Sequence, residues 1–323
     1  MARFAAGRLL ESLIVLGAMS FAVYVLIGLM PGDPIDLMIS GNPRMTSEDA
    51  ARLRALYGLD KPIVERYGTW LAAALHGDFG YSRTYTQPVL DVLVPRLGNT
   101  LLLMGVSLAV SLAIAIPLGV LAALRPNSVA DNAVNLFCFA GISVPSFWLA
   151  LLCIILFAVK LGLLPAGGME TVGAGGILDR LQHLVLPVAV LTVTSIGSFT
   201  RFLRASMIQT LRQDYIRTAR AKGVGTVRIL LGHALQNALL PLVTIVGLSF
   251  GNLFSGALIT EIMFSWLGMG KLMYDAILGN DYNLALVGLL FATAATLVGN
   301  LLADIAQVVI DPRVTFASRE AAR

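Results

Sequence analysis

The side chains that most often carry chemistry are few in this sequence, and their spacing brings no reactive group together. Cys138 and Cys153 lie in one apolar run, with neither the spacing nor the flanking residues of a metal site. The three histidines, His76, His183 and His233, are far apart and fall in three different predicted loops. We therefore expect no metal site and no disulfide framework in this chain.

Motifs for nucleotide hydrolysis and for ion coupling are missing as well. The sequence has no GxxxxGK[ST] phosphate loop, since Gly268-Met269-Gly270-Lys271 lacks the first glycine and a following Ser or Thr. Glu11 and Asp304 are the only acids inside the predicted spans, near their ends, so no chain of buried carboxylates is available for proton or sodium coupling. We expect no catalytic residue, and no cofactor in this chain.

The composition places the chain in a membrane. Of its 323 residues, 57% are hydrophobic and 13% are charged, whereas soluble domains carry about 25% charged residues. A helix needs about 20 apolar residues to cross the hydrocarbon layer. Six runs are long enough, at about 9–30, 99–124, 134–160, 185–205, 237–260 and 284–310. The sequence therefore predicts an all-α integral membrane protein with six transmembrane helices.

The distribution of basic residues predicts the orientation. Six spans place both termini on one side, and short loops rich in Lys and Arg stay in the cytoplasm. The loop between the fourth and fifth spans, about 206–236, has a single acid, Asp214, against five basic residues: Arg212, Arg217, Arg220, Lys222 and Arg228. We expect both termini and this loop to be cytoplasmic.

Residues 31–98 would then face outward, and their pattern predicts a small helical cap. Thr46-Ser47-Glu48-Asp49 resembles a capping box, and Pro62 suits the start of a second helix with an apolar stripe. A further short helix is predicted from Pro88. The cap could pack on the outer ends of the spans or could dock a partner that delivers solute, and the composition favours neither.

The cytoplasmic loop is predicted to form a helix, a turn and a second helix at the membrane surface. Asp214 is a plausible cap or first-turn residue, and Ile216, Ala219 and Gly223 share one stripe. Gly223 and Gly225 allow the positive φ of a sharp turn. The basic residues could simply set topology or contact anionic lipid, but small residues at Thr218, Ala219 and Ala221 would also let a partner backbone approach.

This loop also carries a family resemblance. DYIRTARAKG at 214–223, followed by HALQNALLP at 233–241, resembles the EAA loop of permeases in the peptide/nickel family of ATP-binding-cassette importers. Arg217-Thr218-Ala219 stands where the family has its Glu-Ala-Ala opening, and Gly223 is kept. Further segments of the resemblance are PGDP at 31–34, YGLDKP at 57–62, HGDFGYS at 76–82, ITEIMFSWLGMGKLMYDAI at 259–277, NDY at 280–282 and Asp311-Pro312-Arg313.

The resemblance implies a multi-pass subunit of a bacterial cytoplasmic (inner) membrane transporter for di- or oligopeptides. Its parts would be an N-terminal transmembrane helix at 1–30, the outer cap at 31–98, a type I importer permease core at 99–310 and a cytoplasmic tail at 311–323. The implied partners are a second homologous permease, two ATPase subunits that bind ATP and Mg, and an extracytoplasmic solute-binding protein. The implied ATPase-coupling helix consists of Asp214, Tyr215, Arg217, Thr218, Ala219, Arg220, Ala221, Lys222 and Gly223.

The translocation path is less well marked by the sequence. The fifth span contains Gly247, Gly251 and Gly256, which suit close helix packing. The candidate pore-lining residues on this span are Ser249, Asn252 and Ser255. Pro117, Pro145 and Pro187 are expected to bend the second, third and fourth spans. Nickel chelates or glutathione remain alternative substrates, and a secondary transporter without an ATPase remains a different class of alternative.

Overall fold

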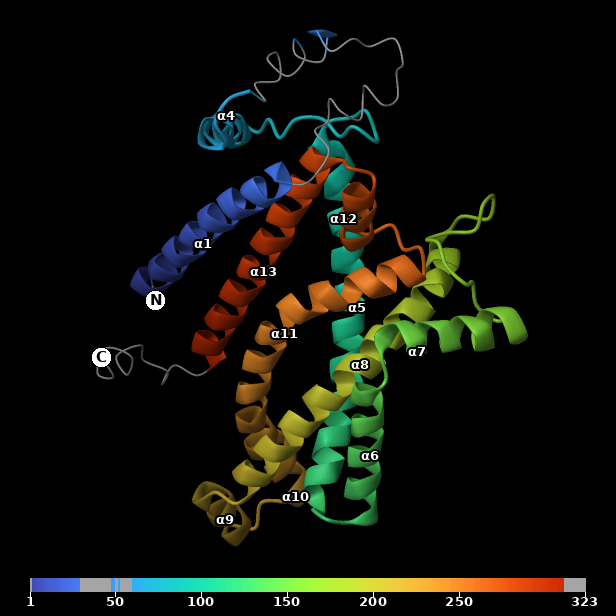
Figure 1. Ribbon diagram of the computed structural model, residues 1–323. Coiled ribbons are helices and arrows are strands. Elements are labelled where there is room, and N and C mark those ends of the chain that lie inside the picture. Colours follow the sequence, from blue (N-terminus) through green and yellow to red (C-terminus); the bar gives the residue numbers. More distant parts are fainter. Residues whose placement is uncertain (1, 30–47, 50–51, 53–59, 311–323) are drawn as a thin grey trace. The chain divides into compact units, whose positions relative to one another are not determined.

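The computed structural model describes residues 2–29, 48–49, 52 and 60–310, and these fold almost entirely into helices (Figure 1). Among these residues, an isolated antiparallel β-bridge pairs Tyr81 with Pro88. The helices in the N-terminal half are α1 (Ala2–Gly28), α4 (Ile63–Leu75), α5 (Val89–Leu124), α6 (Val129–Ser143) and α7 (Ser146–Cys153). Those that follow are α8 (Ile177–Leu211), α9 (Asp214–Ala221), α10 (Thr226–Ile229), α11 (Leu235–Met263), α12 (Met269–Leu278) and α13 (Tyr282–Ile310). Two π-helical segments, η1 (Ile154–Lys160) and η2 (Leu230–Ala234), continue α7 and precede α11.

Five helical stretches are long and apolar enough to cross a membrane, and a bent pair of helices supplies a sixth if it is counted as one span. The five are 7–28, 89–124, 177–211, 226–247 and 282–302. The all-α membrane fold predicted from the sequence is confirmed for the described part of the chain.

The third predicted span is broken rather than continuous. α6 and the α7–η1 stretch meet at an angle of 99°. The break falls at Pro145, and the residue before it, Val144, has the extended φ of −86° and ψ of 123° that a following proline favours. The bend expected at Pro145 is therefore present, and it is much sharper than an ordinary kink.

The helix predicted from Pro88 is not a short separate element. It begins at Val89 and continues without interruption to Leu124, so it forms the first turns of the long helix α5. The start predicted at Thr46 and the segment PGDP lie outside the described residues, as does the tail 311–323.

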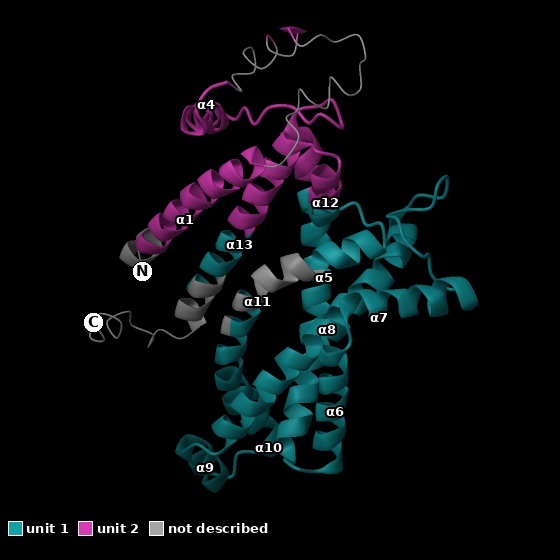
Figure 2. Ribbon diagram, in the orientation of Figure 1, with its two compact units in different colours: residues 1–6, 97–271, 296–323 teal, residues 7–96, 272–295 magenta. Residues whose placement is uncertain are grey.

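The chain divides into two compact units (Figure 2). Unit 1 comprises residues 1–6, 97–271 and 296–323, and unit 2 comprises residues 7–96 and 272–295. In unit 2, the helix predicted after Pro62 is confirmed as α4, which packs on α1. Tyr67 and Ser20 share a hydrogen bond of 2.6 Å, and the rings of Tyr67, Tyr24 and Trp70 contact one another.

In unit 1, α8 is the central helix, and α6 crosses it closely through two glycines. A Cβ atom added to Gly197 of α8 would lie 2.6 Å from the Cys138 carbonyl oxygen, and one added to Gly141 of α6 would lie 2.8 Å from the Val193 carbonyl oxygen. Both contacts are with backbone, which cannot move aside as a side-chain end can. Small residues therefore set the distance between these helices.

Candidate functional site

The basic loop folds as the predicted helix, turn and helix. α9 follows α8 after a turn at Arg212 and Gln213, and Asp214 is a first-turn residue of α9 rather than its cap. A negative side chain in the first turn complements the helix dipole. The Asp214 carboxylate also forms an ion pair with the Arg217 guanidinium, with an N–O distance of 3.1 Å. Both side chains are largely exposed, so this pair contributes little stability.

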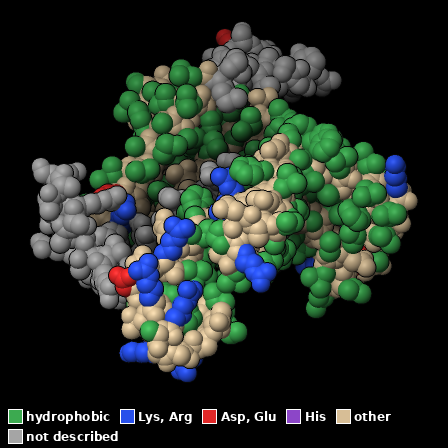
Figure 3. All heavy atoms as spheres, turned by 90° about the horizontal axis from the view of Figure 1, so that it is seen from below, with side chains coloured by type: hydrophobic (Ala, Val, Ile, Leu, Met, Phe, Trp, Pro, Cys, Tyr) green, Lys and Arg blue, Asp and Glu red, His purple; other side chains and the backbone are tan. Residues whose placement is uncertain are grey.

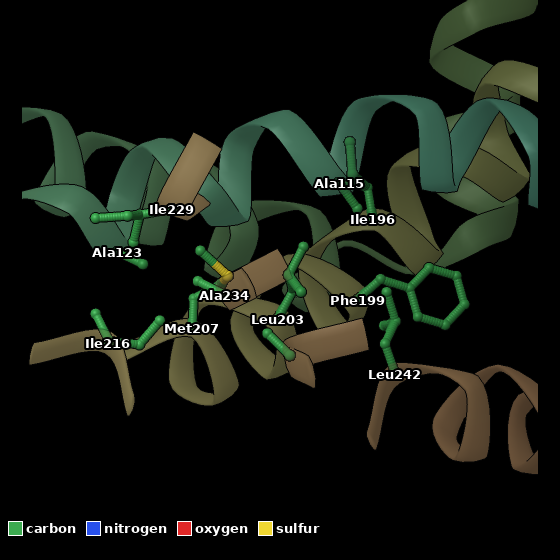
Figure 4. Close-up of a cluster of buried hydrophobic side chains, with 11 residues drawn as sticks. Ala115, Ala123, Ile196, Phe199, Leu203, Met207, Ile216, Ile229, Ala234 and Leu242 are labelled. Carbon is green, nitrogen blue, oxygen red and sulfur yellow. The ribbon is translucent and has the colours of Figure 1, made fainter. Parts of the chain in front are cut away.

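α9 is attached to the rest of unit 1 through Ile216, whose side chain is completely buried. Figure 4 shows it in a cluster of apolar side chains that come from several helices. The partners of Ile216 in this cluster include Met207 of α8, Ala123 of α5 and Ile229 of α10. Ala219, which shares a stripe with Ile216, packs against the same cluster, whereas Gly223 of that stripe is exposed. The cluster thus makes α9 part of the unit 1 core and not a free surface helix.

Most of the other predicted coupling residues face outward. Arg217, Thr218, Arg220, Ala221, Lys222 and Gly223 are exposed, as is Tyr215, whereas Ala219 is half-buried. Partial burial of the Tyr215 ring raises the pKa of its hydroxyl. Lys and Arg side chains gather on the face of the molecule seen in Figure 3. The outward side of α9 therefore offers a positive, hydrogen-bonding surface.

Gly223 ends α9 in a Schellman motif. Its φ is +76°, its N–H donates to the Arg220 carbonyl oxygen at 2.9 Å, and the Val224 N–H donates to the Ala219 carbonyl oxygen at 3.2 Å. Gly225, the second glycine of the turn, has a φ of −63° and serves as the N-cap of α10. Only Gly223 therefore needs the positive φ that the sequence allowed for both glycines.

A second feature near this loop was missed by sequence reasoning. Asp131 in the first turn of α6 is buried, and the Arg204 guanidinium of α8 binds both carboxylate oxygens, with contacts of 2.5 and 2.6 Å. Asn127 and Asn135 donate two further hydrogen bonds to the same carboxylate. The resulting clamp ties α6 to α8 two to three turns before α9 begins. Ser128 caps α6, and Ser128-x-x-Asp131 is a capping pattern that could have marked the helix start.

The candidate pore-lining residues Ser249, Asn252 and Ser255 lie on α11, but their side chains are outside the described part of the structure. On α8, the Thr194 hydroxyl donates to backbone carbonyl oxygens of its own helix, at Val190 and Leu191. An apolar groove of about 490 Å³ lies between α5 and α8. Its lining, which includes Val106, Val110 and Val188, does not suit the polar groups of a peptide backbone.

Two motifs of the family resemblance that lie far apart in the sequence meet in unit 2. The Asp281 carboxylate is buried and accepts hydrogen bonds from the Ser82 hydroxyl at 2.5 Å and from the Thr84 N–H at 2.9 Å. Arg83 donates to the Gly279 carbonyl oxygen. The HGDFGYS and NDY segments therefore form one clasp that attaches the loop before α5 to the turn before α13.

The long apolar helices define the class of protein: a multi-pass membrane protein. The sequence matches the family described as "Binding-protein-dependent transport system inner membrane component" over residues 115–316. Residues 1–104 match the corresponding N-terminal family. The chain belongs to this family of permease subunits.

Relatives and solved structures agree with that assignment. The chain is 40% identical to the oligopeptide transport system permease protein AppB of Bacillus subtilis over 98% of this chain and 100% of the relative. It is 35% identical to the dipeptide transport system permease protein DppB of Escherichia coli K12, over 90% of this chain and 92% of the relative. Two crystal forms of the MetNI methionine ABC transporter in inward facing conformations match with TM-scores of 0.57 and 0.55, at 19% identity, over 68% of this chain and 97% of theirs. At this identity the likeness confirms the permease fold.

Proposed function

We propose that this chain is the permease subunit of an ATP-driven importer for di- or oligopeptides, and that α9 is the helix through which a separate ATPase moves it. The observation that carries the proposal is the construction of α9. Its basic outer side is exposed while Ile216 fixes its inner side in the core shared by α5, α8 and α10. A force applied to the outer side would therefore reach three other helices.

The remaining parts of the proposal follow from the family. A second homologous permease completes the pore, and an extracytoplasmic binding protein delivers the solute. ATP and Mg are bound by two partner ATPases, because this sequence has no phosphate loop. The peptide substrate is supported by the names of the relatives, which are oligopeptide and dipeptide permeases. α9 and both termini lie in the cytoplasm, as the positive loop indicates.

The two glycines of the turn provide a matched test of the coupling role. A Cβ atom at either Gly223 or Gly225 meets nothing within 4 Å, so neither alanine would clash. Only Gly223→Ala forces an L residue into left-handed backbone, at roughly 1–2 kcal/mol. We expect Gly223→Ala to reduce retention of the ATPase subunits during purification and uptake of peptide by membrane vesicles, and Gly225→Ala to leave both unchanged. Equal behaviour of the two variants would contradict the coupling role of α9.

Orientation and substrate need separate measurements. Val227 is exposed beside α9, so a cysteine introduced there should react with a membrane-impermeant maleimide only in inside-out vesicles. Reaction from the outside would overturn the proposed topology. Competition of peptides against nickel chelates and glutathione for the cognate binding protein tests the substrate class.

A further inference from the structure

A buried carboxylate, Glu261, lies at the outer end of α11 and has no part in the coupling site. Its side chain is completely buried in unit 1, where an ionised group needs partners. The Thr100 hydroxyl of α5 donates to Oε1 at 2.5 Å, and the Lys271 N–H donates to Oε2 at 2.9 Å. Both carboxylate oxygens therefore accept hydrogen bonds.

The Thr100 hydroxyl connects the same carboxylate to the start of α12. The Met269 N–H donates to Thr100 Oγ1 at 2.8 Å, so the single hydroxyl proton is directed to Glu261. Gly268 and Gly270 leave the space that the carboxylate occupies, since a Cβ atom at Gly268 would collide with it and one at Gly270 would lie 2.9 Å from Oε2. These contacts explain why glycine stands at both positions, Gly268 in the turn and Gly270 at the start of α12.

A second pair of bonds attaches the same turn to α5. Asn99 Nδ2 donates to the Leu267 carbonyl oxygen at 2.7 Å, and Trp266 Nε1 donates to the Asn99 carbonyl oxygen at 3.1 Å. The Trp266 ring is buried against Leu103 of α5 and Leu191 of α8. Residues 261–271 and residues 99–100 thus form one bonded group at the outer end of unit 1, which we call the outer latch.

The outer latch is joined to the cytoplasmic loop by a single helical stretch. α10, η2 and α11 run in succession from Thr226, just after the Gly223 turn, to Met263. α5 contributes Ala123 to the cluster around Ile216 at one end and Thr100 to the latch at the other. α5 and α11 are therefore connected at both ends, by apolar packing on the α9 side and by a carboxylate on the opposite side.

We propose that Glu261 is the positioning residue that makes the outer ends of α5 and α11 move as one body when the transporter changes conformation. The inference rests on the proposed function, since it assumes that the permease is driven through α9. A neutral side chain of the same shape would keep the packing. It would put an amide N–H₂ in place of one carboxylate oxygen. Facing Lys271, this group would lose the bond from the Lys271 N–H; facing Thr100, it would leave the Thr100 hydroxyl proton without its acceptor. Either way the latch would lose one bond.

The outer latch can be tested by the distance between two exposed side chains. Leu102 of α5 and Leu267 of the turn are 52% and 41% exposed, so both can carry spin labels once Cys138 and Cys153 are replaced by Ser. In the full complex with its ATPases and binding protein, we expect one narrow distance that is the same without nucleotide and after trapping with ATP and vanadate. Glu261→Gln should broaden the distribution in at least one state. A distance that changes with nucleotide in the wild-type complex would overturn the proposal.

Function supplies the second measurement. Uptake of radiolabelled trialanine and pentaalanine per ATP hydrolysed should fall about tenfold in Glu261→Gln. The loss of one hydrogen bond to a buried charged group shifts the equilibrium between the closed and the open latch by about this factor. Thr100→Ser keeps the hydroxyl and should retain the wild-type uptake and the narrow distance. Thr100→Val removes the hydroxyl and should behave as Glu261→Gln does. Ser111→Ala is the matched control, because Ser111 is a buried hydroxyl of α5 that donates to the Ser107 carbonyl oxygen in its own helix.

The remaining outcomes also decide the matter. If Glu261→Gln fails to assemble, Thr100→Val is measured in its place. If both fail to assemble, Glu261 serves folding alone, and the proposal is overturned. If Glu261→Gln behaves as Ser111→Ala does, the carboxylate does not hold the outer latch, and the proposal is overturned as well. Failure of the proposed function would show differently, as ATP-independent uptake by the wild-type complex, and the spin-label distance would still report on the latch.

Discussion

Replacement of Ile216 by alanine isolates the attachment of α9 from its surface chemistry. The change removes three buried carbon atoms, worth about 0.8 kcal/mol each in transfer free energy, and leaves a cavity that raises the total to about 3 kcal/mol. Alanine is also a better helix former than isoleucine. α9 itself is therefore not weakened, and any loss of order must come from its attachment.

About 3 kcal/mol corresponds to roughly a hundredfold change in the equilibrium between attached and detached α9. We expect amide hydrogen exchange of residues 214–221 to accelerate by up to that factor in nanodiscs, and peptide uptake per ATP hydrolysed to fall. Val227→Ala is the control, because Val227 is 68% exposed in the same loop. If the α9 amides exchange as slowly in Ile216→Ala as in Val227→Ala, the claim that Ile216 holds α9 in the core is wrong.

Three further predictions concern the described helices and loops. Gly197→Ala should lower the unfolding midpoint by overpacking against the Cys138 carbonyl, at about 1–3 kcal/mol, while Gly105→Ala, whose Cβ meets nothing within 4 Å, should be neutral or stabilising. In thermal unfolding, Arg204→Met should lower the midpoint more than Asp131→Ala does. Arg204→Met leaves a carboxylate that is 1% exposed without its main partner, whereas the Arg204 side chain is 23% exposed and can reach water. The midpoint of the double variant should lie closer to that of the wild type than the midpoint of Arg204→Met does. Asp281→Asn should weaken the clasp in unit 2 and speed proteolytic cleavage at a recognition site inserted after Tyr85. The same inserted site in an otherwise wild-type chain serves as the reference.

Local patterns in the sequence were sufficient to predict the helix, turn and helix of the basic loop. The spacing placed Ile216 and Ala219 on one stripe of α9, and the structure shows that this stripe faces the core. The glycine at position 223 marked the turn, because a sharp turn depends on a few neighbouring residues. The family followed from motifs in this loop and elsewhere. The coupling role of α9 and the pore-lining role of the α11 residues stay predictions.

Features that depend on how helices cross could not be derived in this way. Asp131 and Arg204 are 73 residues apart, and Ser82 and Asp281 are 199 residues apart. Their meeting depends on helix crossings that hydropathy does not encode, and the HGDFGYS and NDY motifs were identified without any indication that they touch. The break at Pro145 was expected as a bend, but its angle of 99° depends on packing around both halves.

Three buried carboxylates were not predicted from the sequence, because they lie just outside the apolar runs and not within them. Asp131, Glu261 and Asp281 lie one to three residues beyond the ends of the predicted spans. A charge at the membrane centre costs about 2.5–3.5 kcal/mol on insertion scales. At a helix end, by contrast, the first backbone N–H groups have no partner within the helix and can donate to a carboxylate. All three side chains use such groups or the N–H groups of adjoining turns: Asn127 for Asp131, Lys271 for Glu261, and Thr84 and Leu284 for Asp281. Acids just outside an apolar run therefore fix helix ends in this fold, and in a permease of this kind they are the first residues to test for control of the ends that must move.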